Sequence, residues 1–142
     1  MYCKLEDKSS WKDVKTHFKK AKGENAKMWI RVALDQDSLR YVEETGHTYI
    51  DGPHIKEFYF DESTAKQLEE DGFLVEMWNK MDALFDWGDC DFFSAEKCRV
   101  FKTWLEVKLS GNVSNDIREI YEVMQEYAVE VINHHTGIYF DF

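Results

Sequence analysis

The chain has little proline, glycine or cysteine. Its 142 residues include one proline and seven glycines, too few for a linker between domains. Its three cysteines, Cys3, Cys90 and Cys98, are odd in number and lack the spacing of a disulfide framework, which favours a reducing compartment. The N-terminus is charged where a secretory peptide is apolar, and no run approaches the ~18 apolar residues of a membrane span. We therefore expect one domain, residues 1–142, in the cytoplasm.

Sequence fingerprints of common active sites are absent as well. The chain contains no glycine-rich phosphate loop, no GxGxxG, no GxSxG and no HExxH. Paired carboxylates can serve in acid–base chemistry, but nothing in their spacing selects one pair among the 28 acidic residues. We therefore expect a protein that is not an enzyme and that has no cofactor.

Acidic residues are in excess, and they are unevenly placed. Residues 1–31 contain nine Lys or Arg and four Asp or Glu, a net charge of +5, whereas residues 32–142 contain nine and twenty-four, a net charge of −15. The acid is densest from Glu57 to Glu96, where twelve carboxylates face only Lys66 and Lys80, with nine aromatic residues among them. Charge density of this kind bears on partners and association rates rather than on the fold.

Residue patterns in the first part of the chain predict one helix followed by strands. Apolar residues at helical spacing after Ser10, with lysines between them, predict an amphipathic helix that Gly23 ends. Alternating apolar residues and turn signals then predict an antiparallel meander of three or four strands. Its extended segments cover residues 28–34, 39–43, 47–51 and 55–60.

After these strands the spacing of apolar residues becomes helical. One wide apolar stripe consists of Phe73, Leu74, Met77, Trp78, Met81, Leu84 and Phe85. Residues 86–93 break the pattern and are expected to form a loop, and Ser94 and Ser114 are expected to cap two further helices. Gly137 is a natural residue to follow the last helix, and residues 138–142 look like a terminal strand that needs the earlier sheet as its partner.

The pattern as a whole predicts an α+β fold. About four helices would pack on one face of a small, mostly antiparallel sheet, and the C-terminal half would be helical with a terminal strand. The helix after Ser94 would turn Cys98, Phe101 and Leu105 inward, and the last helix would bury a stripe from Ile117 to Val131.

The histidines and cysteines are poorly arranged for a metal or a nucleophile. His134 and His135 are adjacent, so on a helix their side chains diverge by about 100°, and a helix end where histidine complements the dipole is favoured. His47 and His54 flank a predicted strand and are expected in exposed loops. We assign no metal site, although the sequence does not decide whether these four histidines bind a metal, with Asp141 as a further ligand.

The cysteine near the middle of the chain is not expected to be catalytic. Asp89 and Asp91 adjoin Cys90 and would raise its thiol pKa, whereas a nucleophilic cysteine needs positive surroundings. The same aspartates do not form an EF-hand, because the positions that require glycine and glutamate hold other residues.

The acidic, aromatic-rich segment from Glu57 to Glu96 predicts an interface for a basic protein. Carboxylates steer a cationic protein and accept bidentate arginine bonds, while aromatic residues supply buried anchors. The predicted contact residues are Asp82, Asp86, Trp87, Asp89, Asp91 and Glu96, with Trp87 as the anchor. The alternative is that the acids form a solvated surface and the aromatic residues, including Phe73, Trp78, Phe85 and Phe92 or Phe93, belong to the core.

Nucleic acids and membranes are not expected partners. The lysine-rich first helix has a narrow basic face, and the acidic remainder of the molecule would repel phosphate. We expect its lysines to offset part of the acidic field within the fold or within a dimer. The sequence does not determine the oligomeric state.

In its small size, acidity and content of aromatic residues the chain resembles bacterial immunity proteins. Residues 87–93, with Cys98 and Leu105 after them, and the closing residues 136–142 are also similar to a recurrent pattern of small bacterial proteins. Immunity proteins bind and block a toxin domain, often a basic nuclease. The resemblance implies an inhibitor that neutralises a basic, nuclease-like toxin domain by direct 1:1 binding.

Three classes of function therefore compete. An inhibitor of the immunity type predicts salt-sensitive association with a basic protein. A mimic of nucleic acid that blocks a DNA-binding or defence protein predicts carboxylates spaced like phosphates along one face. A small metal-binding protein or enzyme predicts a pocket in which histidine and aspartate side chains converge. The inhibitor is the function that we expect.

Overall fold

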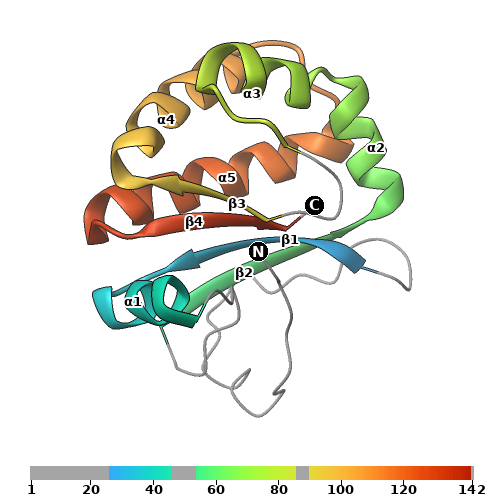
Figure 1. Cartoon of the computed structure of the whole chain (residues 1–142). Helices are drawn as coiled ribbons and strands as arrows, with labels where there is room; N and C mark the ends of the chain where they lie inside the picture. Colours follow the sequence, from blue (N-terminus) through green and yellow to red (C-terminus); the bar gives the residue numbers. More distant parts are fainter. Residues whose placement is uncertain (1–25, 46–53, 86–89, 142) are drawn as a thin grey trace.

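The computed structural model of the chain describes residues 26–45, 54–85 and 90–141 (Figure 1). The described strands are β1 (Ala26–Ala33), β2 (Ile55–Asp61), β3 (Cys90–Ser94) and β4 (Gly137–Asp141). The described helices are α1 (Gln36–Thr45), α2 (Glu62–Glu70), α3 (Phe73–Met81), α4 (Ala95–Ser110) and α5 (Asn115–His134). The predicted α+β class is confirmed, with a C-terminal half that is mainly helical and ends in a strand. The predicted helix over residues 10–23 and strand over residues 47–51 lie outside the described residues.

All neighbouring strands of the sheet are antiparallel, in the order β2-β1-β4-β3. The terminal strand β4 pairs with β1, where Ile30 lies opposite Phe140, so the predicted partnership with the earlier sheet is confirmed. The predicted meander is wrong. In a meander, the neighbours of β1 would be strands close to it in sequence, but here one neighbour is β4, the last strand of the chain. This strand order follows from contacts between distant segments and not from the local sequence.

The main core lies between the sheet and helices α2 to α5, which gather on one side of it in Figure 1, while α1 lies on the other side. Alternation along the strands turns Ile30, Phe58 and Phe140 toward these four helices, and all three are buried. Helix α5 buries its whole predicted stripe from Ile117 to Val131. In the described part of the chain, no helix combines the length and apolar character needed to cross a membrane.

Residues 39–43 are helical rather than extended, which corrects the predicted second strand. Asp35 caps helix α1, because its Oδ1 accepts a hydrogen bond from the backbone N–H of Ser38 at 2.8 Å. Leu39, on this helix, packs against Ala33, Ile55 and Tyr139 on the second face of the sheet. Leu39, one of the apolar residues that predicted a strand, therefore lies on a helix that covers this face of the sheet.

Residues 90–94 form strand β3, which corrects the predicted loop at residues 90–93, whereas residues 86–89 lie outside the described residues. Phe93 lies opposite Ile138 of β4 and is buried in the core, whereas Phe92 lies opposite Tyr139 with ring centroids 5.0 Å apart. The two adjacent phenylalanines therefore contact different faces of the sheet. Such a short strand is stabilised by its partner, and the local sequence carries little sign of it.

Gly137 begins strand β4 and does not end helix α5 as predicted. His135 takes the left-handed conformation at the end of that helix, with φ of 55°, and its backbone N–H bonds to the carbonyl of Val131. At Gly137 an added Cβ would lie 1.9 Å from the ring of Phe92. The glycine is needed there because an aromatic ring occupies the space of a side chain.

The predicted apolar stripe of residues 73–85 is only partly buried. Phe73, Met77, Met81 and Phe85 are buried, and Leu74 packs against the core in part. Trp78 is 53% exposed, so the interpretation that places it in the core is wrong, and Leu84, also assigned to the stripe, is 62% exposed. Helix α3 ends at Met81, and the left-handed conformation of Asp82, with φ of 51°, interrupts the spacing that assigned Leu84 to the same face.

Candidate partner-binding site

The six predicted contact residues come from several different elements. Asp86, Trp87 and Asp89 lie outside the described residues, and their role stays a prediction. Among the others, Asp82 is exposed directly after α3, Asp91 is half-buried within β3, and Glu96 is exposed in the first turn of α4.

Two of these acidic residues also have structural roles. Glu96 lies in the first turn of α4, where a negative charge is favourable beside the helix N-terminus. Asp91 lies on β3, which is an edge strand among the strands described, and a charge there opposes unwanted pairing with another sheet. Each of these two acids therefore has a role in the fold that does not require a binding protein.

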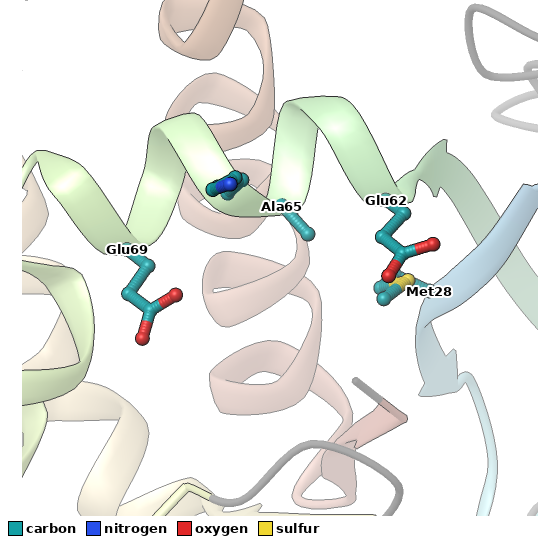
Figure 2. Close-up of a pocket in the computed structure, with 5 residues that line it drawn as sticks. Met28, Glu62, Ala65 and Glu69 are labelled. Carbon is teal, nitrogen blue, oxygen red and sulfur yellow. The ribbon is translucent and has the colours of Figure 1, made fainter.

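A pocket beside α2 combines carboxylates with an apolar surface. Its volume is about 320 Å³, and it is lined by Met28, Glu62, Ala65, Lys66 and Glu69. Figure 2 shows that the side chains of Glu62 and Glu69 project from the same side of α2, with Met28 of β1 next to Glu62. The two glutamates are seven positions apart, so they lie two turns apart on one face of the helix.

The end of β2 fixes helix α2 in this position. Asp61 is the last residue of the strand and the N-cap of the helix, and its Oδ1 accepts hydrogen bonds from the backbone N–H of Thr64 at 2.8 Å and from its hydroxyl at 2.7 Å. The helix buries Ala65 and Leu68. Its glutamates at the pocket remain exposed.

The two pocket carboxylates have no partner among the residues that the structure describes. Neither Glu62 nor Glu69 makes a side-chain hydrogen bond or ion pair with any residue in the described ranges, and Lys66 makes none either. Two negative charges and one positive charge thus surround an apolar floor of Met28 and Ala65. A lysine or arginine from a partner would place its aliphatic stem on this floor and its charge between the carboxylates.

A second acidic surface, which the sequence analysis missed, runs along α5. It consists of Asp116, Glu119, Glu122, Glu126 and Glu130. Their spacing of three or four residues places them on the side of the helix opposite its buried stripe. We call this row the α5 acidic row. The same spacing that revealed the buried stripe could have revealed it.

The α5 acidic row is anchored at its C-terminal end by one lysine and one histidine. Lys56 Nζ lies 2.9 Å from Glu130 Oε1 and 3.8 Å from Glu126 Oε2, and His134 Nε2 lies 3.1 Å from Glu130 Oε2. Burial opposes ionisation of Glu130, but the hydrogen bonds and charges of Lys56 and His134 outweigh it and lower its pKa.

The histidines in the described part of the chain bond to acids or lie at a helix end. His54 is exposed, as predicted, and its Nδ1 contacts a carboxylate oxygen of Asp35. Gln36 donates hydrogen bonds to the carbonyls of His134 and His135, at 3.1 and 2.6 Å, which brings α1 to the end of α5. Within residues 26–45, 54–85 and 90–141, no three His, Cys, Asp or Glu side chains are grouped so that they could hold a metal ion.

The second face of the sheet holds a buried ion pair. Arg31 Nε lies 2.7 Å from Glu57 Oε1, and the hydroxyl of Tyr59 donates to Glu57 Oε2 at 2.6 Å. Burial, and then the charge of Glu57, raise the pKa of Tyr59, which keeps its hydroxyl protonated as a donor. Glu57 was the first acid of the segment predicted as a surface. That assignment is wrong for Glu57, because its side chain is buried and paired.

The pocket beside α2 is therefore the described feature with the chemistry best suited to a basic partner. Comparison of the chain with protein-family models, with curated proteins and with solved structures found no match. Support for a function accordingly comes from the charges and contacts of the chain's own surface.

Proposed function

We propose that the protein binds and blocks a basic protein, in the manner of an immunity protein that neutralises a nuclease-like toxin domain. The observation that carries this proposal is the pocket beside α2, where Glu62 and Glu69 flank an apolar floor without partners in the described part of the fold. Exposed carboxylates that form no hydrogen bond or ion pair with the described residues can accept hydrogen bonds from a cationic side chain of another protein.

The net charge of the chain supports the same function. A charge of −10 attracts a cationic partner over distances of about a Debye length and raises the rate of encounter. The pocket would then receive one arginine or lysine in the 1:1 complex. The exposed Asp82 and Glu96, the half-buried Asp91, and the predicted contacts Asp86, Trp87 and Asp89 are proposed as further parts of the interface.

The test needs the natural partner and two matched variants. The protein is used as bait in cells of its source, the captured protein is purified, and its association is measured by biolayer interferometry at low and high salt. We expect the double substitution Glu62→Gln and Glu69→Gln to slow association and to reduce its salt dependence, with a loss in affinity of at least about tenfold for two desolvated contacts. The toxic activity of the partner should fall on stoichiometric addition of the wild-type protein.

Two single substitutions on the same helix serve as controls. Glu70→Gln removes one carboxylate charge from an exposed residue that does not line the pocket, and unlike the single substitution Glu69→Gln it should leave the affinity nearly unchanged. Lys66→Gln removes the one cation among the described residues that line the pocket, and it should strengthen binding. The proposal is wrong if the partner is acidic, if its activity is unaffected, or if Glu70→Gln weakens binding as much as the pocket substitutions.

A mimic of nucleic acid is a second candidate, and the α5 acidic row favours it. Steps of three and four residues correspond to about 4.5–6 Å along a helix axis. Phosphates on one DNA strand follow one another every ~3.4 Å along the duplex, so the row is a sparser line of charge of the same sign. This candidate predicts that duplex DNA competes for the partner and that Glu119→Gln with Glu122→Gln weakens binding more than Glu62→Gln with Glu69→Gln.

A further inference from the structure

A second hollow lies between α3 and α4 and differs in charge from the rest of the protein. It has a volume of about 460 Å³ and is lined by Lys80, Met81, Arg99, Val100, Thr103 and Trp104. Among the described residues, no carboxylate lines it. In a chain with a net charge of −10, the described lining of this hollow therefore combines two exposed cations with the exposed Val100 and the half-buried Trp104, above the buried Met81.

The two cations of the hollow have no partner in the described part of the fold. Lys80 and Arg99 are exposed, and neither side chain makes a hydrogen bond or ion pair with a residue of the described part. By contrast, Lys102, which like Arg99 lies on α4, forms an ion pair with Glu106 at 2.9 Å. The charges of Lys80 and Arg99 are thus available to an anionic group that comes to the hollow.

The apolar part of the hollow is held in a fixed place. The ring of Trp104 contacts the rings of Phe73, Phe101 and Tyr121 at centroid distances of 6.0, 6.1 and 5.8 Å. Beside it, Val100 is 57% exposed. A fixed ring next to an exposed aliphatic side chain offers a preformed contact for another apolar group.

We propose that this hollow binds an acidic peptide segment of a partner protein, with a large apolar side chain against Val100 and Trp104 and carboxylates near Lys80 and Arg99. Charge complementarity sets the sign of the partner, since cations without carboxylates line the hollow. Four of the six lining residues, Lys80, Arg99, Val100 and Thr103, are exposed, so the site lies at the surface and suits a protein segment better than an enclosed small molecule.

This hollow is distinct from the pocket beside α2. The two have opposite charge, share no lining residue and come from different helices. Asp82 and Glu96, proposed above as contacts of the basic partner, lie one position from Met81 and three positions from Arg99, so a basic partner that reaches them would compete with an acidic segment at the hollow. The inference does not rest on the proposed inhibitor function and can hold where that function fails.

Fluorescence polarisation with a labelled peptide tests the proposal. The probe carries a central Leu-Phe pair with aspartate and glutamate on both sides, and the reference peptide has asparagine and glutamine in their place. We expect the acidic peptide to bind and the neutral one to bind at least about fivefold more weakly, because two rim charge pairs are lost. The double substitution Arg99→Gln and Lys80→Gln should lower the affinity for the acidic peptide to a similar extent. High salt should lower it as well.

Matched variants separate the charge effect from the apolar contact. Lys102→Gln removes a cation from the same helix as Arg99 but outside the hollow, and it should leave binding unchanged. Val100→Ser alters an exposed residue, which the fold tolerates, and it should weaken both peptides. The proposal is overturned if the acidic peptide does not bind, if both peptides bind equally, or if Lys102→Gln has the same effect as Arg99→Gln.

Discussion

Arg31 and Glu57 form an ion pair across β1 and β2, with 2.7 Å between Nε and Oε1 and with both side chains 1% exposed. The two residues lie opposite each other in the register of the strands. The Arg31 guanidinium also lies 3.9 Å from the ring centroid of Trp29. A pair so deeply buried is costly to desolvate, and its partners must remain together for the sheet to be stable.

Removal of one member of this pair should therefore destabilise the protein strongly. Glu57→Gln keeps the size of the side chain but leaves the arginine charge without its counter-charge, and we expect a loss of about 3–5 kcal/mol in the free energy of unfolding. Urea denaturation followed by circular dichroism measures it. The double substitution Arg31→Met and Glu57→Leu should cost much less than Glu57→Gln. Equal losses in the two variants would contradict the pairing.

Asp141 should make the protein less stable as the pH rises toward neutrality. Burial raises its pKa from 3.8 to about 6, although the charge of Arg31 opposes this shift. An acid with a raised pKa in the folded state contributes stability at low pH, and this contribution is lost as the pH rises from about 4 to above 6.

Asp141→Asn should remove that pH dependence. We expect the variant to be more stable than the wild type at pH 7 and the difference to vanish near pH 4, where both side chains are neutral. Urea denaturation at a series of pH values gives the comparison. Parallel curves for the two proteins over this range would show that Asp141 does not titrate as described.

Gly137→Ala should destabilise the sheet because its methyl group meets the ring of Phe92. The distance of 1.9 Å requires the ring to move, and its exposure of 40% means that it can do so in part. We expect a cost of about 1–3 kcal/mol, measured by thermal or urea unfolding. The loss should be smaller when Gly137→Ala is introduced together with Phe92→Ala. An equally large loss in both backgrounds would place its origin elsewhere.

Cys98 should resist alkylation in the folded protein. It is buried, and burial raises the pKa of its thiol to about 12, so very little thiolate exists at neutral pH. Treatment with iodoacetamide and peptide mass spectrometry should show modification of Cys98 in denaturant and almost none without it. Rapid labelling of Cys98 under native conditions would contradict its place in the core.

Much of the helical layer and the α5 acidic row could be predicted from the sequence, but the burial of Glu57 and the pocket at Glu62 could not. The spacing that predicts the buried faces of α4 and α5 is local, and a face that is apolar every three or four residues has to be buried somewhere. The role of Glu57 depends instead on Arg31 across the sheet, and the pocket at Glu62 depends on Met28 of another strand. Composition alone therefore placed the buried and paired Glu57 in the same acidic segment as the exposed Glu62 and Glu69, which have no partner among the described residues.

The sequence by itself determined the α+β class, the inward faces of the long helices and the acidic character of the chain. The tertiary structure decided that α1 is a helix, that residues 90–94 join the sheet, and that β4 lies between β1 and β3. It also decided which carboxylates are buried, which line a pocket and where Gly137 is required. The physical reason is that periodicity records which side of a segment is apolar, whereas strand order and the partners of a charge depend on residues far away in the chain.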